Sequence, residues 1–181
     1  MNALPSTVFL DRDGTIIKDA EYISQPEQVE LIDGAAEAIA RINAALVPVV
    51  VATNQSGIGR GYFSRTDYES VDARMKALLA ERGARIDATY FCPHQPEDGC
   101  RCRKPGTLMF EWARDDLGID LSSALFIGDR LRDVEPAVKF GARGVLVPTD
   151  TTPPAETVTA NNSVRVANSL GEALDWYLCT N

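Results

Sequence analysis

A chain of 181 residues, 45% of them hydrophobic, can bury one core, so we expect one domain spanning residues 1–181. Its formal net charge of −8 is opposite in sign to the surface that binds nucleic acids, so no nucleic-acid partner is expected. No basic, apolar leader opens the chain and no apolar run approaches the ~20 residues that cross a bilayer, so we expect a cytoplasmic protein without a membrane partner. We further expect a monomer.

Short apolar runs alternate with amphipathic segments along the chain. In chain order, the apolar runs predict strands at 7–10, 47–52, 88–91, 124–127 and 144–147. The amphipathic segments, several of them closed by glycine, predict helices at 34–46, 65–82, 107–117, 133–140 and 169–178. Residues 149–163 are predicted to be a loop, and 14–30 the most mobile segment. Apolar strands separated by helices indicate the α/β class, with a Rossmann-like three-layer fold around a mostly parallel sheet.

Polar residues follow the predicted strands at their carboxyl ends, where parallel sheets bind ligands. Asp11 and Asp13 follow the first strand, Thr53 ends the second, and Asp129 follows the fourth. Two carboxylates two positions apart lie on the same side of an extended backbone. Such a pair can divide nucleophilic and acid–base work, although the same residues also suit a plain surface turn.

A cysteine-rich segment follows the third predicted strand. Three of the four cysteines and the only histidine lie close together there, as Cys92, His94, Cys100 and Cys102. Three thiolates and one imidazole make the closed tetrahedral shell of a structural zinc site, so we expect a zinc-binding loop at 92–102. A chance cluster of reduced thiols is the alternative, and Cys179 is interpreted as an ordinary thiol. A metal in this loop would fix where Arg103 and Lys104 point.

The run Asp11-Arg12-Asp13-Gly14-Thr15 resembles the first motif of the haloacid-dehalogenase superfamily of phosphatases. Thr53 matches the second motif, Lys104 before Pro105 the third, and Gly128-Asp129 the fourth, all in the expected order. The resemblance implies a capless haloacid-dehalogenase type of fold. It also implies hydrolysis of phosphoric monoesters through an aspartyl-phosphate intermediate.

The resemblance implies catalytic roles for Asp11, Asp13, Thr53 and Lys104. Asp11 would be the nucleophile, and Asp13 the group that protonates the leaving oxygen and later activates water. A catalytic Mg²⁺ would be held by Asp11, the Asp13 backbone carbonyl and Asp129. Asp133 would either support this centre or be an exposed aspartate at the start of a helix.

The cysteine loop before Arg103-Lys104-Pro105 narrows the resemblance to the heptose-1,7-bisphosphate phosphatases and the histidinol-phosphate phosphatases. Residues 53–61 and 19–22 are more similar to the heptose family, which removes the C7 phosphate of a small phosphorylated sugar. The implied substrate contacts are Asp19, Ala20, Glu21, Tyr22, Thr53, Asn54, Gln55, Ser56, Arg103, Lys104 and Arg130. Arg103 and Arg130 suit a second phosphate, since arginine binds phosphate through a planar fork. Leu108 stands where this family usually has glycine, which leaves its effect on the pocket open.

Three alternatives stay open. The related histidinol-phosphate phosphatases act on a cationic substrate, for which Glu21, Glu97 and Asp98 are candidate contacts. A zinc-stabilised binding module without activity would explain the cysteine loop but leave the four motifs as coincidence. Transfer of the phosphoryl group to an acceptor other than water is the third.

Overall fold

A sheet of six strands lies at the centre of the structure, a computed structural model that describes residues 4–157 and 164–178. The strand order is β3-β2-β1-β4-β5-β6, and each neighbouring pair is parallel. The strands are β1 Val8–Leu10, β2 Val49–Asn54, β3 Ala88–Cys92, β4 Leu125–Gly128, β5 Arg143–Leu146 and β6 Val164–Val166. The mostly parallel sheet expected from the sequence is confirmed.

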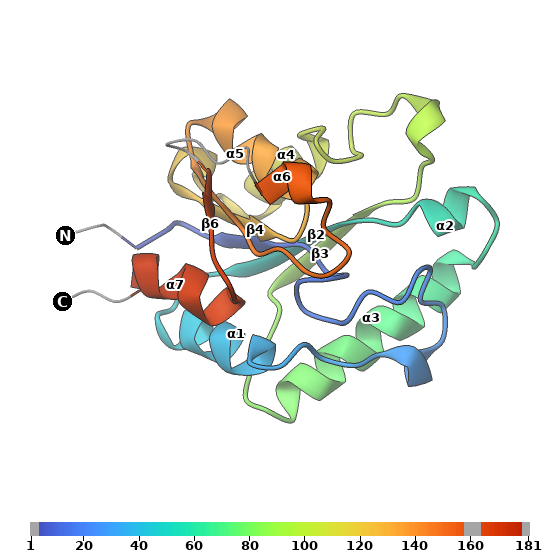
Figure 1. Ribbon diagram of the computed structural model, residues 1–181, viewed down its shortest axis with the longest axis horizontal. Helices are drawn as coiled ribbons and strands as arrows, with labels where there is room; N and C mark the ends of the chain where they lie inside the picture. The colour runs from blue at the N-terminus through green and yellow to red at the C-terminus, as the bar shows by residue number, and fades with distance from the viewer. Residues whose placement is uncertain (1–3, 158–163, 179–181) are drawn as a thin grey trace.

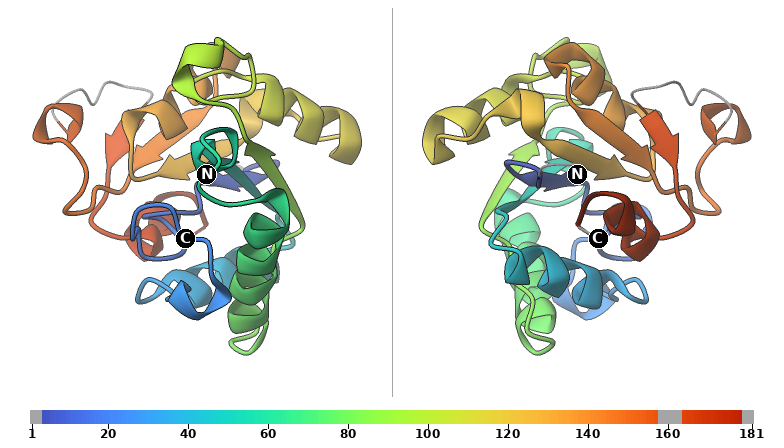
Figure 2. Two further views of the ribbon diagram at one scale, coloured as in Figure 1. Left: turned by 90° about the vertical axis from the view of Figure 1, so that its right-hand side faces the viewer. Right: turned by 90° about the vertical axis from the view of Figure 1, so that its left-hand side faces the viewer.

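Helices cover both faces of this sheet, as the three-layer prediction required. Figure 1 shows α1, α3 and α7 below the sheet and α4 and α5 above it, and the end views of Figure 2 show the same layering. The longer helices are α1 Ala35–Ala44, α3 Arg65–Ala80, α4 Leu108–Leu117, α5 Leu131–Phe140 and α7 Leu170–Leu178. Shorter turns are η1 Pro26–Gln28, α2 Ser56–Gly59, η2 Pro96–Asp98, η3 Leu121–Ser123 and α6 Pro154–Thr157.

Alternating side chains of the strands build a separate core on each face of the sheet. Val8 and Leu10 belong to the cluster that packs on α1, α3 and α7. Phe9, between them, points to the other face, as the two-residue period of a strand requires. There its ring stacks on Phe126 at a centroid distance of 4.9 Å and meets Phe110 edge-on at 5.0 Å. The strand that carries the predicted nucleophile is thus anchored on both faces.

Several predicted boundaries were wrong in ways that matter for the site. β2 runs on to Asn54, and α5 begins at Leu131, so Asp133 lies inside its first turn. α1 ends at Ala44, two residues before the predicted end, and Leu46 beyond it is 85% exposed. The described part of the predicted loop contains α6, while residues 158–163 lie outside the described residues. β6 was missed because three residues carry too little periodicity to predict a strand.

No helix in the described part of the chain has the length and apolar character needed to cross a membrane. The single domain over 1–181 and the monomeric state stay predictions.

Candidate active site

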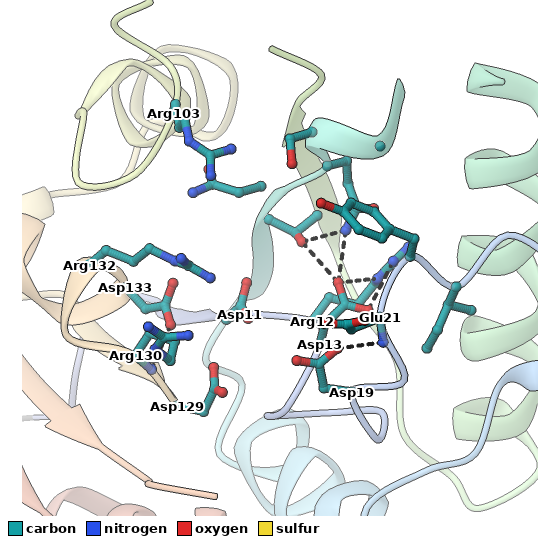
Figure 3. Close-up of a pocket in the computed structure, with 17 residues that line it drawn as sticks. Asp11, Arg12, Asp13, Asp19, Glu21, Arg103, Asp129, Arg130, Arg132 and Asp133 are labelled. Atoms are coloured by element: carbon teal, nitrogen blue, oxygen red, sulfur yellow. Dashed lines mark hydrogen bonds and ion pairs between the residues drawn. The ribbon is translucent and has the colours of Figure 1, made fainter. Parts of the chain in front are cut away.

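The polar residues predicted at the strand ends meet in one pocket of about 330 Å³ (Figure 3). β1 lies between β2 and β4, so Asp11, Thr53 and Asp129 come from three adjacent strands. The pocket is lined by Asp11, Arg12, Asp13, Asp19, Glu21, Tyr22, Ile23, Thr53, Asn54, Gln55, Ser56, Gly57, Arg103, Asp129, Arg130, Arg132 and Asp133.

Lys104, a predicted substrate contact, does not line this pocket; it binds two carboxylates, one of them Asp11. Its Nζ is 2.6 Å from Asp11 Oδ1 and 2.7 Å from Asp133 Oδ1, and it also donates to the Ala52 carbonyl at 2.6 Å. Lys104 and Asp133 are 3% and 4% exposed, so Asp133 is not the exposed helix aspartate of the alternative interpretation. Gly128 makes room for this pair, because a Cβ at that position would overlap the Asp133 side chain.

Three carboxylates form a site that suits a divalent cation. Asp11, Asp129 and Asp133 each offer an oxygen, and these oxygens lie within 4.8 Å of one another. Asp129 Oδ1 is buried and has no hydrogen-bond partner among the described residues. Burial, reinforced by the neighbouring carboxylates, raises the pKa of Asp11 to about 7 and that of Asp129 to about 8. The residues therefore fit a hard cation such as Mg²⁺, which prefers oxygen ligands and would favour their charged forms.

Asp13 is held by partners other than Lys104. The guanidinium of Arg12 donates to both of its carboxylate oxygens, from Nη2 at 3.0 Å and from Nε at 3.1 Å. Gln55 Nε2 donates to Asp13 at 2.8 Å, and the Thr53 hydroxyl lies 3.5 Å away. Arg12 is 1% exposed and stacks over the Tyr68 ring at 5.3 Å. No role was predicted for Arg12, although its place between the two motif carboxylates was a usable signal.

Three arginines supply positive charge to one side of the pocket. Figure 3 shows Arg103, Arg132 and Arg130 to one side of Asp11, with Asp19 and Glu21 on the other. Arg132 was not predicted to line the pocket, although it lies two positions after Arg130, shortly after the end of β4. These side chains give an acidic protein a local cationic surface suited to a phosphorylated ligand.

Most of the other predicted substrate contacts line the pocket. Asp19, Glu21, Tyr22, Asn54, Gln55 and Ser56 line the pocket, whereas Ala20 does not. Leu108 also lies outside the pocket lining and packs against the core on the α4 side of the sheet. Of the three acidic residues considered for a cationic substrate, Glu21 lines the pocket, while Glu97 and Asp98 lie in η2 and do not.

Cys92, His94, Cys100 and Cys102 converge into one cluster beside the pocket. The Sγ atoms of Cys92 and Cys102 are 3.3 Å apart, those of Cys100 and Cys102 3.5 Å, and those of Cys92 and Cys100 3.6 Å. His94 Nδ1 lies 3.6 Å from Cys92 Sγ and 3.2 Å from Cys102 Sγ. A tetrahedral zinc site has ligand–ligand separations of about 3.8 Å, so the arrangement suits such an ion. Burial raises the pKa of the Cys92 thiol, so the thiolate needs a cation nearby.

The cysteine loop is also joined to α2, whose first residues line the pocket. Gly59 N–H donates to the Pro93 carbonyl at 2.9 Å, and Gln95 Nε2 donates to the Gly59 carbonyl at 2.9 Å. Figure 1 shows this loop above α2 at one end of the sheet. The loop therefore links two parts of the pocket lining, the start of α2 and Arg103.

Comparisons with known proteins agree on one group of enzymes. The family described as HAD-hydrolase-like matches residues 101–173. The chain is 43% identical over 145 residues to the D-glycero-β-D-manno-heptose-1,7-bisphosphate 7-phosphatase of Pseudomonas aeruginosa, which covers 80% of this chain and 82% of that one. It is 37% identical over 172 residues to the enzyme of the same name from Escherichia coli K12, covering 91% and 90%. The crystal structure of the D,D-heptose 1,7-bisphosphate phosphatase from B. bronchiseptica, complexed with magnesium and phosphate, is similar with a TM-score of 0.85 and 33% identity, covering 95% of this chain and 98% of that one.

Proposed function

We propose, from the premise that this chain belongs to the family of D-glycero-D-manno-heptose-1,7-bisphosphate 7-phosphatases, that it hydrolyses the C7 phosphate of this sugar bisphosphate. The observation that carries the proposal is the convergence of Asp11 and Asp129 in one pocket, with Lys104 paired to Asp11 from a distant part of the chain. The similarity to relatives of this name, over most of both chains, supports the choice of substrate.

Mg²⁺ is the proposed catalytic metal, held by Asp11, the Asp13 backbone carbonyl and Asp129. The magnesium in the B. bronchiseptica relative and the partnerless, buried Asp129 Oδ1 support this assignment. When bound, the ion neutralises carboxylate charge and polarises the phosphate.

The chemistry divides between the two carboxylates of the first motif. An Asp11 oxygen attacks phosphorus, forming the aspartyl phosphate while the bond from phosphorus to the C7 oxygen breaks. Asp13 gives its proton to that leaving oxygen, and then takes a proton from the water that hydrolyses the aspartyl phosphate.

The surrounding residues bind and orient the phosphoryl group. Lys104 neutralises charge at Asp11 and at the transferring phosphoryl group, and Thr53 donates its hydroxyl hydrogen. We assign the sugar to Asp19–Tyr22 and the phosphate that is retained to Arg103 and Arg130. Arg132 joins them as a third cation of the pocket.

Zinc is the proposed structural metal of the 92–102 loop. All four candidate ligands belong to the chain, so a tetrahedral ion there has no open position for water and is not expected to catalyse hydrolysis. Its role is to fix the loop from which Arg103 and Lys104 emerge.

A phosphate-release screen tests the proposal. With saturating Mg²⁺, the heptose 1,7-bisphosphate should give the highest kcat/KM among sugar bisphosphates and histidinol phosphate, with release of one phosphate per molecule. Asp11→Asn should lower kcat by ~10⁴-fold or more, since the nucleophile is lost. Faster turnover of histidinol phosphate would reject the substrate assignment, and an active Asp11→Asn variant would reject the mechanism.

A further inference from the structure

The segment between β5 and β6 holds three consecutive residues of the loop that follows β4. The Thr152 hydroxyl donates to the Asp129 carbonyl at 2.7 Å. Glu156, on α6, accepts at Oε1 from Arg130 Nη2 at 3.0 Å and from Arg130 Nε at 3.2 Å. Its Oε2 accepts from the Leu131 N–H at 2.5 Å. None of these contacts has a part in the chemistry above, yet they hold the loop that carries a proposed metal ligand and a proposed phosphate ligand.

The contact with Glu156 leaves part of the Arg130 guanidinium available. Both donors that bind Glu156, Nε and Nη2, lie on one edge of the planar group. Nη1 has no protein partner within residues 4–157 and 164–178, and Arg130 lines the pocket beside Asp129. A side chain that is fixed along one edge presents the remaining N–H groups in a defined direction.

Fixing Arg130 in advance favours anion binding because an unpaired arginine loses rotamer freedom when it grips a ligand. Arg132 gives a contrast within the same pocket: it is exposed and has no ion pair among the described residues. Burial opposes ionisation of Glu156, but hydrogen bonds from Arg130 and Leu131 outweigh it and lower the pKa of that carboxyl. Glu156 is therefore ionised at neutral pH.

We propose that Glu156 is a positioning residue that sets Arg130 to bind the phosphate that is not removed, so that the enzyme prefers a sugar bisphosphate to the matching monophosphate. This inference rests on the proposed function. It assigns a role in substrate choice to α6, which lies outside the four superfamily motifs.

The test compares kcat and KM on heptose 1,7-bisphosphate and on heptose 7-phosphate, with saturating Mg²⁺. Glu156→Ala should raise KM for the bisphosphate by roughly threefold to tenfold, the cost of ordering one long side chain, and leave kcat and the monophosphate kinetics near wild type. Glu156→Gln should keep most of the preference, because its carbonyl oxygen can still accept from Arg130. Asp150→Asn removes one charge from the same segment and should match wild type.

A double-mutant cycle shows whether Glu156 acts through Arg130. Arg130→Lys should cause the same selective rise in KM, and adding Glu156→Ala to it should change nothing further. An equal loss on both substrates, additive effects of the two substitutions, or a lower KM in Glu156→Ala would overturn the proposal. A wild-type enzyme with no preference for the bisphosphate would also overturn it while leaving the proposed function intact, whereas failure to release the C7 phosphate from either sugar would reject the proposed function.

Discussion

Asn54 and Lys104 exchange two hydrogen bonds between the end of β2 and the end of the cysteine loop. Asn54 Oδ1 accepts from the Lys104 N–H at 2.9 Å, and Asn54 Nδ2 donates to the Lys104 carbonyl at 3.2 Å. Asn54 therefore fixes the backbone of the residue whose ammonium reaches Asp11. It lines the pocket as well, so the expected substrate contact and this positioning role fall on one side chain.

Replacing Asn54 by Ala should displace Lys104 and lower kcat/KM. We expect a loss of about tenfold to a hundredfold, because small displacements of catalytic groups are costly. Steady-state kinetics with heptose 1,7-bisphosphate as the substrate measures this loss of kcat/KM. Asn168→Ala is the matched control, since its side chain bonds Glu172 far from the pocket and its loss should leave kcat/KM unchanged. Wild-type kinetics for Asn54→Ala would contradict the role.

The stability of the metal-free protein should fall as pH rises from 5 to 8. A carboxyl whose pKa is higher in the folded than in the unfolded chain binds more protons when folded, so it stabilises the fold at low pH and loses this contribution as pH rises through the folded pKa. In the folded protein, burial raises the pKa of Asp11 to about 7 and that of Asp129 to about 8.

Thermal unfolding in EDTA across this pH range measures the effect. Asp129→Asn should be more stable than wild type at pH 8 and closer to it at pH 5. Added Mg²⁺ should raise the Tm of wild type more at pH 8 than at pH 5, because the cation binds the charged carboxylates. An Asp129→Asn variant that unfolds below wild type at pH 8 in EDTA would be inconsistent with this account.

Removal of zinc should lower the Tm and raise KM. The cluster of Cys92, His94, Cys100 and Cys102 fixes the loop that ends at Arg103 and Lys104, so a loosened loop should bind the phosphates less well. The assay uses stripped protein that is still folded, in excess Mg²⁺, with zinc content determined before and after. Unchanged kinetics would reject the positioning role of zinc.

Gly59→Ala should separate the cysteine loop from α2. A Cβ on Gly59 would lie 2.7 Å from the Pro93 carbonyl oxygen, so the loop must shift, at a cost of about 1–3 kcal/mol. We expect a lower unfolding free energy together with a higher KM. Gly171→Ala in α7 is the control: its nearest neighbour is Ser169 Oγ at 3.7 Å, so the protein should keep its activity and gain up to about 1 kcal/mol.

Tyr62→Ala should raise KM by perturbing the pocket rim. Tyr22 lines the pocket with a left-handed φ of 57°, and its ring meets Tyr62 edge-on at a centroid distance of 4.8 Å. Such a backbone persists only where contacts hold it. Tyr62→Phe keeps the ring and should retain the wild-type KM; an equal rise in both variants would point to the hydroxyl instead.

The sequence predicted the sheet and the main carboxylates because both depend on local patterns. Asp11 and Asp129 each follow an apolar strand directly, and parallel strands bring their carboxyl ends together whatever the loops do. The Arg130–Glu156 pair could not be predicted, since it joins residues 26 positions apart through a segment without periodicity. The Arg12–Asp13 fork was missed for another reason: it depends on the Tyr68 ring under Arg12 and on Gln55 beside Asp13, which are distant in sequence.

The Lys104–Asp11 ion pair joins residues 93 positions apart, and Asp129 arrives from a strand made later still. Catalytic competence consequently depends on long-range contacts: during synthesis no nascent segment that ends before Asp133 holds the complete centre. On refolding, recovery of turnover should accompany closure of the most distant strand pairings, the slow class of folding event. Turnover thus reports long-range order in this protein, whereas helix content does not.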